Sequence, residues 1–304
     1  LAKTRGTFIG RLAADAILAL RVADGWDKHT VLDFNYPQGT APGEYKFTPP
    51  FTFAFLPQWD KVTPFVLRDA AQFRPGPPYA VTSRRYAIDL NEVKRLGGNG
   101  TTTPSERTSE QTEIALFWLE SSPLQWNRIA RTVATAERLT LWEKARLFAL
   151  LNFALTDGYI GTFETKYHYN YWRPITAIRE AATDGNPLTS GDAMWTPLVD
   201  TPPIPDYDSG HSVEGGAAAQ VLKRFFGTDF IRFRTCSTTL PAGSNCGDPS
   251  PVRRSYRSFS EAAEENGVSR IFIGFHFRKA VTEGIEHGRK IGNRAVNHYL
   301  RPLH

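Results

Sequence analysis

Three short stretches of this 304-residue chain carry side chains suited to binding an oxyanion. Lysine and arginine supply charged donors, a serine and a glycine N–H supply neutral donors, and two histidines can transfer protons. The residues are Lys166 and Arg173, then Ser209, Gly210 and His211, and finally Arg270 and His276. Three cations buried together are costly unless an anion neutralises them. Together the stretches predict a site for phosphate or a phosphate-like ion.

The first stretch is "KYHYNYWRP", in which Lys166 precedes Arg173 by seven positions. On a continuous helix these positions share a face, roughly 10 Å apart along the axis. Pro174 disfavours helical geometry at Arg173, so the helix is expected to end there. Arginine would give paired donors and lysine a compact charge to one small anion. Taken alone, the pair also fits two solvated surface cations.

The second stretch is "PDYDSGHSVEGG", which is typical of a helix start. Ser209 is a good N-cap residue, and the free N–H groups of a helix N-terminus attract anions. Gly210 would add a backbone donor, and His211 could pass a proton to the bound ion. The alternative is an ordinary cap followed by a surface histidine.

The third stretch is "SRIFIGFHFRKA", in which Arg270 precedes His276 by six positions. At ~100° per residue these two positions do not share a face of a straight helix. Arg270 must therefore reach around from the side, or the backbone must change direction near Gly274. Because Phe275 and Phe277 flank the histidine, it also fits a buried core histidine.

The three stretches resemble the superfamily shared by the vanadium-dependent haloperoxidases and the type 2 phosphatidic acid phosphatases. That superfamily has Lys, six residues and Arg–Pro, then Pro–Ser–Gly–His, then Ser–Arg, five residues and His. The first block matches in full over 166–174 and the third over 269–276. The second matches over 209–211, with Asp208 in place of the proline. The stretches "LPQWDKVTPFVL", "RTSEQTEIALFW" and "KYHYNYWRPITAIR" resemble the haloperoxidase branch, particularly its bacterial members.

The resemblance implies a vanadate cofactor whose metal is bound directly by His276. The vanadate oxygens would contact the five other binding residues, Lys166, Arg173, Ser209, Gly210 and Arg270. It also implies that His211 acts as acid and base toward hydrogen peroxide, and that Lys166 polarises the peroxide. The expected reaction is Lewis-acid oxidation of bromide or iodide to a hypohalous acid.

An acid phosphatase hydrolysing phosphate monoesters is the alternative within the same superfamily. His276 would then attack phosphorus, and His211 would protonate the leaving alcohol. In the phosphatases a carboxylate four positions after the nucleophile supports it, but here that position is Ala280 and the nearest downstream carboxylate is Glu283. This weakens the phosphatase interpretation. A third hypothesis is a non-catalytic phosphate- or vanadate-binding protein, in which Asp208 has spoiled proton transfer.

Two further carboxylates lie close to the stretches in sequence. Asp208 is expected to point outward to the surface, although it could instead hold His211 and raise the pKa of that histidine. Asp157 is expected at a helix terminus before Gly158, or as a carboxylate supporting one of the cations.

Several apolar residues are candidates for the pocket wall. Ile204 falls near the place where some family members carry an aromatic residue or a histidine associated with halide handling, so it indicates no clear selectivity. Phe163, Tyr169 and Trp172 could line the pocket, but their spacing also fits plain core.

The elements expected to position these residues are mostly helices. Patterns of apolar residues predict helices over 6–25, 140–172, 210–226 and 268–299, and capping boxes at Thr108–Gln111 and Thr140–Glu143 open two of the helical runs. The stretch 31–65 is rich in Pro, Gly and aromatic residues and predicts irregular structure, and 97–108 predicts a loop. The expected fold is a mainly α-helical bundle, 1–304, forming one haloperoxidase-like domain with aromatic-rich loops.

Composition is that of a folded protein acting on small molecules. The chain is 41% hydrophobic and 22% charged, and its net charge of +5 is spread along the sequence. This favours small anions over nucleic acid or a membrane surface. No apolar run approaches the length of a membrane span. A homo-oligomer would fit such a helical surface.

Cys236 and Cys246 flank a loop-like run and predict a disulfide, the alternative being two reduced thiols. A disulfide would indicate a secreted or periplasmic protein. The chain begins at Leu1 without a methionine, so we expect that a targeting segment was removed or the chain was trimmed.

Overall fold

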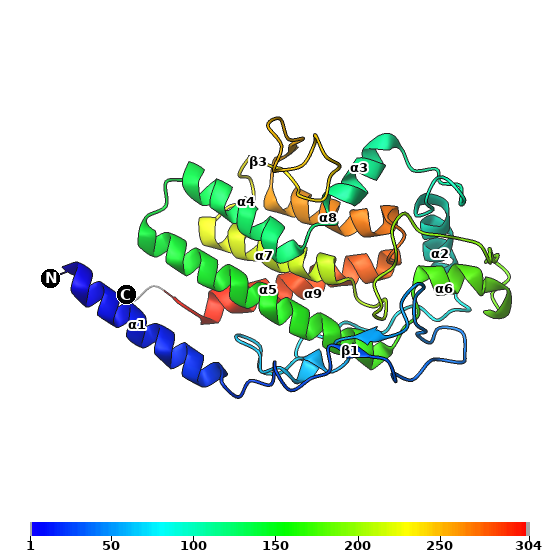
Figure 1. Ribbon diagram of the computed structural model, residues 1–304, viewed down its shortest axis with the longest axis horizontal. Helices are drawn as coiled ribbons and strands as arrows, with labels where there is room; N and C mark the ends of the chain where they lie inside the picture. The colour runs from blue at the N-terminus through cyan, green and yellow to red at the C-terminus, as the bar shows by residue number, and fades with distance from the viewer. Residues whose placement is uncertain (1, 302–304) are drawn as a thin grey trace.

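Long helices aligned along the long axis form the body of the protein (Figure 1). The computed structural model describes residues 2–301. The helices of the body are α4 (Ser122–Ala136), α5 (Leu141–Tyr169), α7 (Gly210–Phe226), α8 (Phe259–Phe272) and α9 (Arg278–His298). Helix α7 packs against each of the other four. The predicted mainly helical bundle is confirmed.

Close packing of α7 against α9 depends on small residues. A Cβ atom on Gly288 of α9 would overlap the carbonyl of Val213, and one on Gly216 of α7 would overlap the carbonyl of Ile285. The two backbones therefore approach as closely as glycine permits. This contact fixes the C-terminal helix against the helix that begins with the Ser–Gly–His stretch.

Both predicted capping boxes are present. Thr140 and Glu143 cap α5 reciprocally, and Thr108 and Gln111 do the same for α3 (Ser109–Phe117). Helix α5 ends at Tyr169, three residues before the predicted end, because Asn170 adopts a left-handed conformation with φ 46°.

The predicted continuous helix between Lys166 and Arg173 is therefore wrong. Arg173 has an extended backbone and is the N-cap of the short helix α6 (Pro174–Arg179). The two cations are brought together by a turn of the chain and not by a shared helical face.

The predicted helix over 268–299 is two helices, α8 and α9. Between them Gly274 has φ +87°, and a Cβ atom there would lie 2.7 Å from the carbonyl oxygen of Gly97. The predicted change of backbone direction near Gly274 is confirmed. It lets Arg270 and His276 approach the same space from different sides.

The N-terminal helix α1 (Ala2–Arg21) projects from the body and buries none of its residues (Figure 1). The prediction placed it over 6–25, but the helix ends before Gly25, which has φ +95° in the following turn. The segment 31–65 is largely irregular, as predicted. It contains only the short strands β1 (Leu32–Asp33) and β2 (Ala54–Phe55) and the helical turn η1 (Trp59–Lys61).

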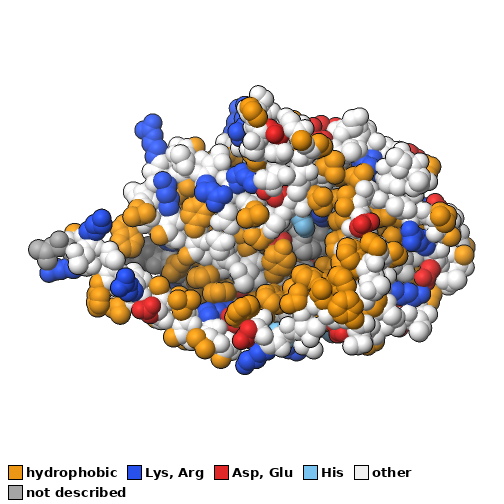
Figure 2. Space-filling model, viewed as in Figure 1, with side chains coloured by type: hydrophobic (Ala, Val, Ile, Leu, Met, Phe, Trp, Pro, Cys, Tyr) orange, Lys and Arg blue, Asp and Glu red, His pale blue; other side chains and the backbone are white. Residues whose placement is uncertain are grey.

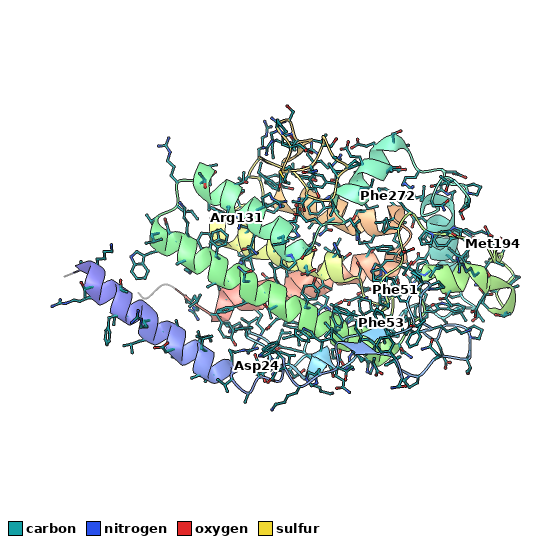
Figure 3. All side chains as sticks on the ribbon, viewed as in Figure 1. Asp24, Phe51, Phe53, Arg131, Met194 and Phe272 are labelled. Atoms are coloured by element: carbon teal, nitrogen blue, oxygen red, sulfur yellow. A yellow bond between two sulfur atoms is a disulfide. The ribbon has the colours of Figure 1, made fainter. Side chains whose placement is uncertain are left out.

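Aromatic pairs hold the irregular segment together. The rings of Phe51 and Phe53 lie 5.6 Å apart in an edge-to-face arrangement, and both are labelled in Figure 3. Phe55 reaches the ring of Phe163 on α5 at 6.3 Å. Such pairs anchor an irregular segment to the bundle without a sheet.

The remaining elements lie around the body. They are α2 (Arg84–Leu96), η2 (Ala181–Thr183), and the antiparallel strands β3 (Phe233–Thr235) and β4 (Arg254–Tyr256). Helix α2 is at one end, and the pair of strands β3 and β4 lies beside α4 and α8 (Figure 1). Cys236 and Cys246 form the predicted disulfide in the loop between β3 and β4. None of the helices within residues 2–301 is long and apolar enough to cross a membrane.

Candidate oxyanion site

The structure brings the three predicted cations to one cavity of about 280 Å³. Lys166 comes from the last turn of α5, Arg173 from the start of α6 and Arg270 from the last turn of α8. Each of the three is only 1% exposed. His211 and His276 line the same cavity. Figure 2 shows hydrophobic side chains around a hollow near the middle of the molecule.

Lys166 is held by backbone carbonyls. Its Nζ donates to the carbonyl oxygens of Pro205 at 2.8 Å and Asp206 at 2.9 Å. Burial lowers its pKa well below the usual lysine value, and the nearby Arg173 adds to this effect. A bound anion would oppose both effects.

Arg173 connects two parts of the site. Its Nε donates to the carbonyl of Ile204 at 2.6 Å, and its Nη1 donates to the carbonyl of Phe275 at 2.9 Å. The same Nη1 lies 3.0 Å from Nε2 of His276. Arg173 therefore ties the chain before α7 to the turn between α8 and α9. Burial lowers its pKa.

Arg270 reaches the cavity from the last turn of α8. Its Nε donates to the hydroxyl of Ser269 at 3.0 Å and its Nη2 to the carbonyl of Trp118 at 2.9 Å. Burial, with a smaller effect from Arg173, lowers its pKa to about 9. Within residues 2–301 none of Lys166, Arg173 and Arg270 forms an ion pair with a carboxylate. The site therefore has an excess of buried positive charge.

His276 has a carboxylate neighbour that sequence reasoning missed. Its Nδ1 lies 2.9 Å from Oδ1 of Asp206, at ion-pair distance, although no well-aligned hydrogen bond reaches either Asp206 oxygen from the residues described. Burial raises the pKa of Asp206 to about 7, with Arg173 and Lys166 opposing the rise. The phosphatase pattern places this carboxylate downstream of the histidine, where the chain has Ala280 and Glu283. Asp206 lies upstream, three positions before Ser209.

Burial and positive charge keep His276 neutral. Burial is the larger cause of the lowered pKa of His276, followed by the charges of Arg173 and Lys166. A neutral imidazole has a lone pair available for a metal or an electrophile. Its Nε2, next to Arg173, is the atom on the opposite side of the ring from the Asp206 contact.

The second stretch begins a helix as predicted, and Ser209 is the N-cap of α7. Its side chain makes no capping bond and instead accepts a hydrogen bond from the hydroxyl of Ser212 at 2.9 Å. Gly210 and His211 line the cavity. His211 is half-buried, and its Nε2 lies 3.3 Å from the carbonyl oxygen of Glu120. Burial first, and then the charge of Arg270, lower the pKa of His211.

Asp208 does not point outward, so that expectation is wrong. It is fully buried, its Oδ1 accepts a hydrogen bond from Thr162 at 2.7 Å, and its Oδ2 lies 2.9 Å from Nδ1 of His287 on α9. Its histidine partner is therefore His287, and the suggested contact with His211 is not formed. A buried carboxylate is tolerated here because two donors satisfy it.

Neither expectation for Asp157 is correct. It lies within α5, where its carboxylate accepts the backbone N–H groups of Phe65, Val66 and Leu67 at 2.7 to 2.8 Å. It fastens the irregular N-terminal segment to the bundle and supports none of the site's cations directly.

Of the four candidate wall residues, Ile204 and Phe163 line the cavity. Tyr169 donates its hydroxyl hydrogen to the carbonyl of Pro75, and Trp172 is fully buried in the core. The other wall residues are Phe55, Leu119, Tyr159, Pro202, Glu214 and Phe275. Their positions could not be read from sequence because they come from six separate parts of the chain.

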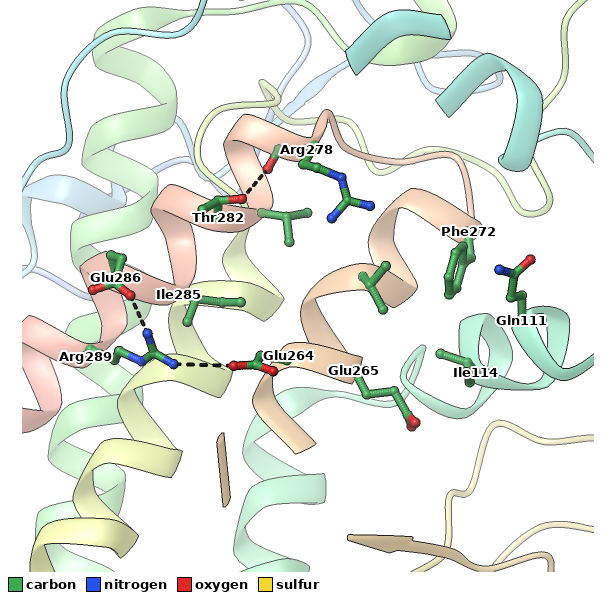
Figure 4. A pocket seen from close by; sticks show the side chains of 12 residues that line it. Gln111, Ile114, Glu264, Glu265, Phe272, Arg278, Thr282, Ile285, Glu286 and Arg289 are labelled. Carbon is green, nitrogen blue, oxygen red and sulfur yellow. Dashed lines mark hydrogen bonds and ion pairs between the residues drawn. The ribbon is translucent and has the colours of Figure 1, made fainter. Parts of the chain in front are cut away.

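A larger cavity of about 640 Å³ lies between α3, α8 and α9 (Figure 4). Its charged side chains form ion pairs, including those of Arg289 with Glu264 and Glu286. Its lining includes none of the seven candidate site residues from the three stretches. We therefore place the candidate site in the smaller cavity.

Comparison with known proteins gives consistent matches. Residues 146–304 match the family model described as the VCPO second helical-bundle domain. The chain is 28% identical over 286 residues to a vanadium chloroperoxidase of Curvularia inaequalis. That match covers 75% of this chain and 46% of the relative. The chain thus spans about half the length of the curated relative it matches.

Solved structures agree with this match. The crystal structure of the first bacterial vanadium-dependent iodoperoxidase is 31% identical, with a TM-score of 0.76 over 93% of this chain and 66% of that one. The holo-type bacterial vanadium-dependent chloroperoxidase is 19% identical, with a TM-score of 0.64 over 80% and 54% of the two chains. The second likeness concerns the fold alone.

Proposed function

Because this chain belongs to the vanadium chloroperoxidase family, we propose that it is a vanadate-dependent peroxidase that oxidises a halide with hydrogen peroxide to a hypohalous acid. The observation that carries the proposal is the group of three buried cations around His276, none of which forms an ion pair with a carboxylate of the described residues. Bromide or iodide is the expected halide, and the likeness to a bacterial iodoperoxidase supports that choice.

The residues of the site fit vanadate better than a bare metal cation. The described residues contain no group of three His, Cys, Asp or Glu side chains placed to hold a metal ion. The cavity instead presents cationic and N–H donors, which suit the oxygens of an oxyanion. His276 would bind the metal, and the oxygens would contact Lys166, Arg173, Ser209, Gly210 and Arg270. When bound, vanadate would supply a pentavalent Lewis acid that activates peroxide.

The residues of the chain would handle the protons and the charge. His211 has a lowered pKa, so its imidazole is neutral near pH 7 and can accept a proton from hydrogen peroxide. Lys166, fixed by two carbonyls, would direct its remaining N–H toward a peroxide oxygen and draw electron density from it. The apolar wall, including Phe163, would limit water around these groups.

Acid phosphatase activity is the second candidate, and the contact between Asp206 and His276 favours it. A carboxylate beside Nδ1 orients an imidazole for attack through Nε2, which is the support that the sequence seemed to lack. His211 would then protonate the leaving alcohol. The third hypothesis, a non-catalytic binder, rested on Asp208 disturbing proton transfer, and Asp208 contacts His287 instead.

One experiment separates these functions. The purified protein is freed of bound anions and given vanadate, hydrogen peroxide and bromide, and bromination of a chromogenic acceptor is followed. In parallel, hydrolysis of an aryl phosphate is measured without peroxide. Halogenation that requires vanadate and is suppressed by phosphate supports the peroxidase. Ester hydrolysis without halogenation supports the phosphatase, and a His276→Ala variant that retains vanadate would overturn the assignment of the metal ligand.

The remaining proposals concern the location and the partners of the protein. The disulfide supports a secreted or periplasmic location. Small molecules are the proposed partners: peroxide, halide and an organic acceptor. Three properties stay predictions: a single domain over 1–304, the absence of nucleic-acid and membrane partners, and a homo-oligomeric state.

A further inference from the structure

The part of the cavity lined by Lys166, Arg173 and Arg270 is called its cationic end. Two further polar side chains lie in the wall outside this end. They are Tyr159 of α5 and Glu214 of α7, set among apolar residues such as Phe55 and Leu119. Glu214 follows His211 by three positions, so both lie on the same side of α7. The two polar groups are therefore neighbours of the proposed acid and base.

The carboxyl group of Glu214 is buried, and its polar neighbours among the described residues are hydroxyl groups and not cations. Glu214 is 0% exposed, and neither carboxyl oxygen has a well-aligned hydrogen bond with any residue in the range 2–301. The hydroxyls of Ser122 and Tyr159 are its polar neighbours, and burial raises its pKa well above the usual value. A buried carboxyl without a cation stays protonated. Its O–H is then a donor that makes no well-aligned bond with the neighbouring hydroxyls of Ser122 and Tyr159, so it can turn to a ligand.

A small anion with weak hydration suits this part of the cavity. The O–H groups of Glu214 and Tyr159 are neutral donors, and the surrounding wall is apolar. An ionised Glu214 would repel such an anion, whereas a protonated carboxyl can donate to it. Bromide and iodide are large and polarisable, need few donors and tolerate apolar contact. A tetraoxo anion would instead occupy the cationic end.

We propose that Glu214 and Tyr159 bind the halide substrate by donating their O–H hydrogens to bromide or iodide beside His211. This inference rests on the proposed function. Glu214 is then a specificity-determining residue of this chain. Because the carboxyl group of Glu214 is neutral, the halide anion can approach His211, where the peroxide is expected to react.

The position of the halide can be tested without catalysis. Crystals grown with inorganic phosphate, which fills the cationic end, are soaked in bromide and measured at the bromine absorption edge. We expect an anomalous peak within hydrogen-bond distance of Glu214 and Tyr159. The peak should remain in Glu214→Gln, which keeps a neutral donor, and disappear in Glu214→Leu. A wild-type map without a peak there, or a peak unchanged in Glu214→Leu, overturns the proposal.

Kinetics give a second measurement. In Glu214→Leu the KM for bromide should rise about tenfold, as expected for loss of one hydrogen bond to a charged ligand. Glu264→Leu, at the surface between α8 and α9, is the matched control and should leave this KM unchanged. An unchanged bromide KM in Glu214→Leu also overturns the proposal. Failure of the wild type to halogenate would refute the proposed function alone, since the bromide peak does not depend on turnover.

Discussion

Asp206 and His276 lie 2.9 Å apart, with the carboxylate oxygen Oδ1 facing the ring nitrogen Nδ1. Both residues are buried, and the pair is next to Arg173 and Lys166. A carboxylate at Nδ1 fixes the orientation of the imidazole and makes Nε2 a better ligand or nucleophile. The proposed metal ligand therefore has its own support within the chain.

Asp206→Ala is expected to weaken vanadate binding about 10- to 100-fold, as removal of such support does at other metal sites. Asp206→Asn keeps an acceptor oxygen and should lose less. Equilibrium dialysis against vanadate measures both. Glu283→Ala, whose carboxylate pairs with Lys279 on the surface of α9, is the control and should bind as the wild type does. Unchanged affinity in Asp206→Ala would show that the contact has no role in binding.

Oxyanion binding should stabilise the protein because it neutralises three buried cations. Inorganic phosphate at 100 times its Kd should add about 2.7 kcal/mol to the free energy of unfolding. Lys166→Met removes one buried charge, so this variant should be more stable than the wild type in anion-free buffer and respond less to phosphate. Thermal unfolding at increasing phosphate concentration tests this, with Lys223→Met, on the exposed end of α7, as the control.

The same measurement has a predicted pH dependence. Burial lowers the pKa of Lys166, so the folded protein loses this proton at a lower pH than the unfolded chain does. The stabilisation by phosphate should therefore weaken as the pH rises through the lowered pKa. A phosphate effect that grows with pH would contradict the role of Lys166.

Asp208 and His287 should contribute to stability through their buried contact. Asp208→Ala leaves Thr162 and His287 without their acceptor, and we expect a loss of about 3 kcal/mol in the free energy of unfolding. Asp208→Asn keeps an acceptor and should lose less. Chemical denaturation measures the difference, and Asp200→Ala at an exposed position is the control. If Asp208→Ala unfolds at the wild-type denaturant concentration, the pair is not stabilising.

Glu214 should make the protein less stable as the pH rises. Burial raises its pKa, so the folded state keeps a proton that the unfolded chain releases above about pH 4.3. The free energy of unfolding should fall above that pH, at most by about 1.4 kcal/mol per pH unit, until the raised pKa is passed. Glu214→Gln removes this dependence, so its stability relative to wild type should increase from pH 4.5 to 7.5. A constant difference across these values would show that Glu214 is ionised in the folded protein.

The sequence alone specified the local features of this protein. The capping boxes at Thr108 and Thr140 and the start of α7 at Gly210 depend on residues within one helical turn, so their pattern predicts them directly. The three stretches proposed to bind an oxyanion were also evident, because each has a distinctive set of residues at fixed spacing.

Tertiary structure decided which side chains meet. The contacts of Asp206 with His276 and of Asp208 with His287 join residues far apart in the chain, the second pair 79 positions apart. The chain before α7 packs against α9 and against the turn between α8 and α9. This packing decides whether a carboxylate near the site faces His276, His287 or solvent. Glu214 shows the same limit, since only the packing of α5 against α7 places its carboxyl in the cavity wall. Sequence spacing fixes direction within one element, whereas the free energy of packing fixes the relation between elements.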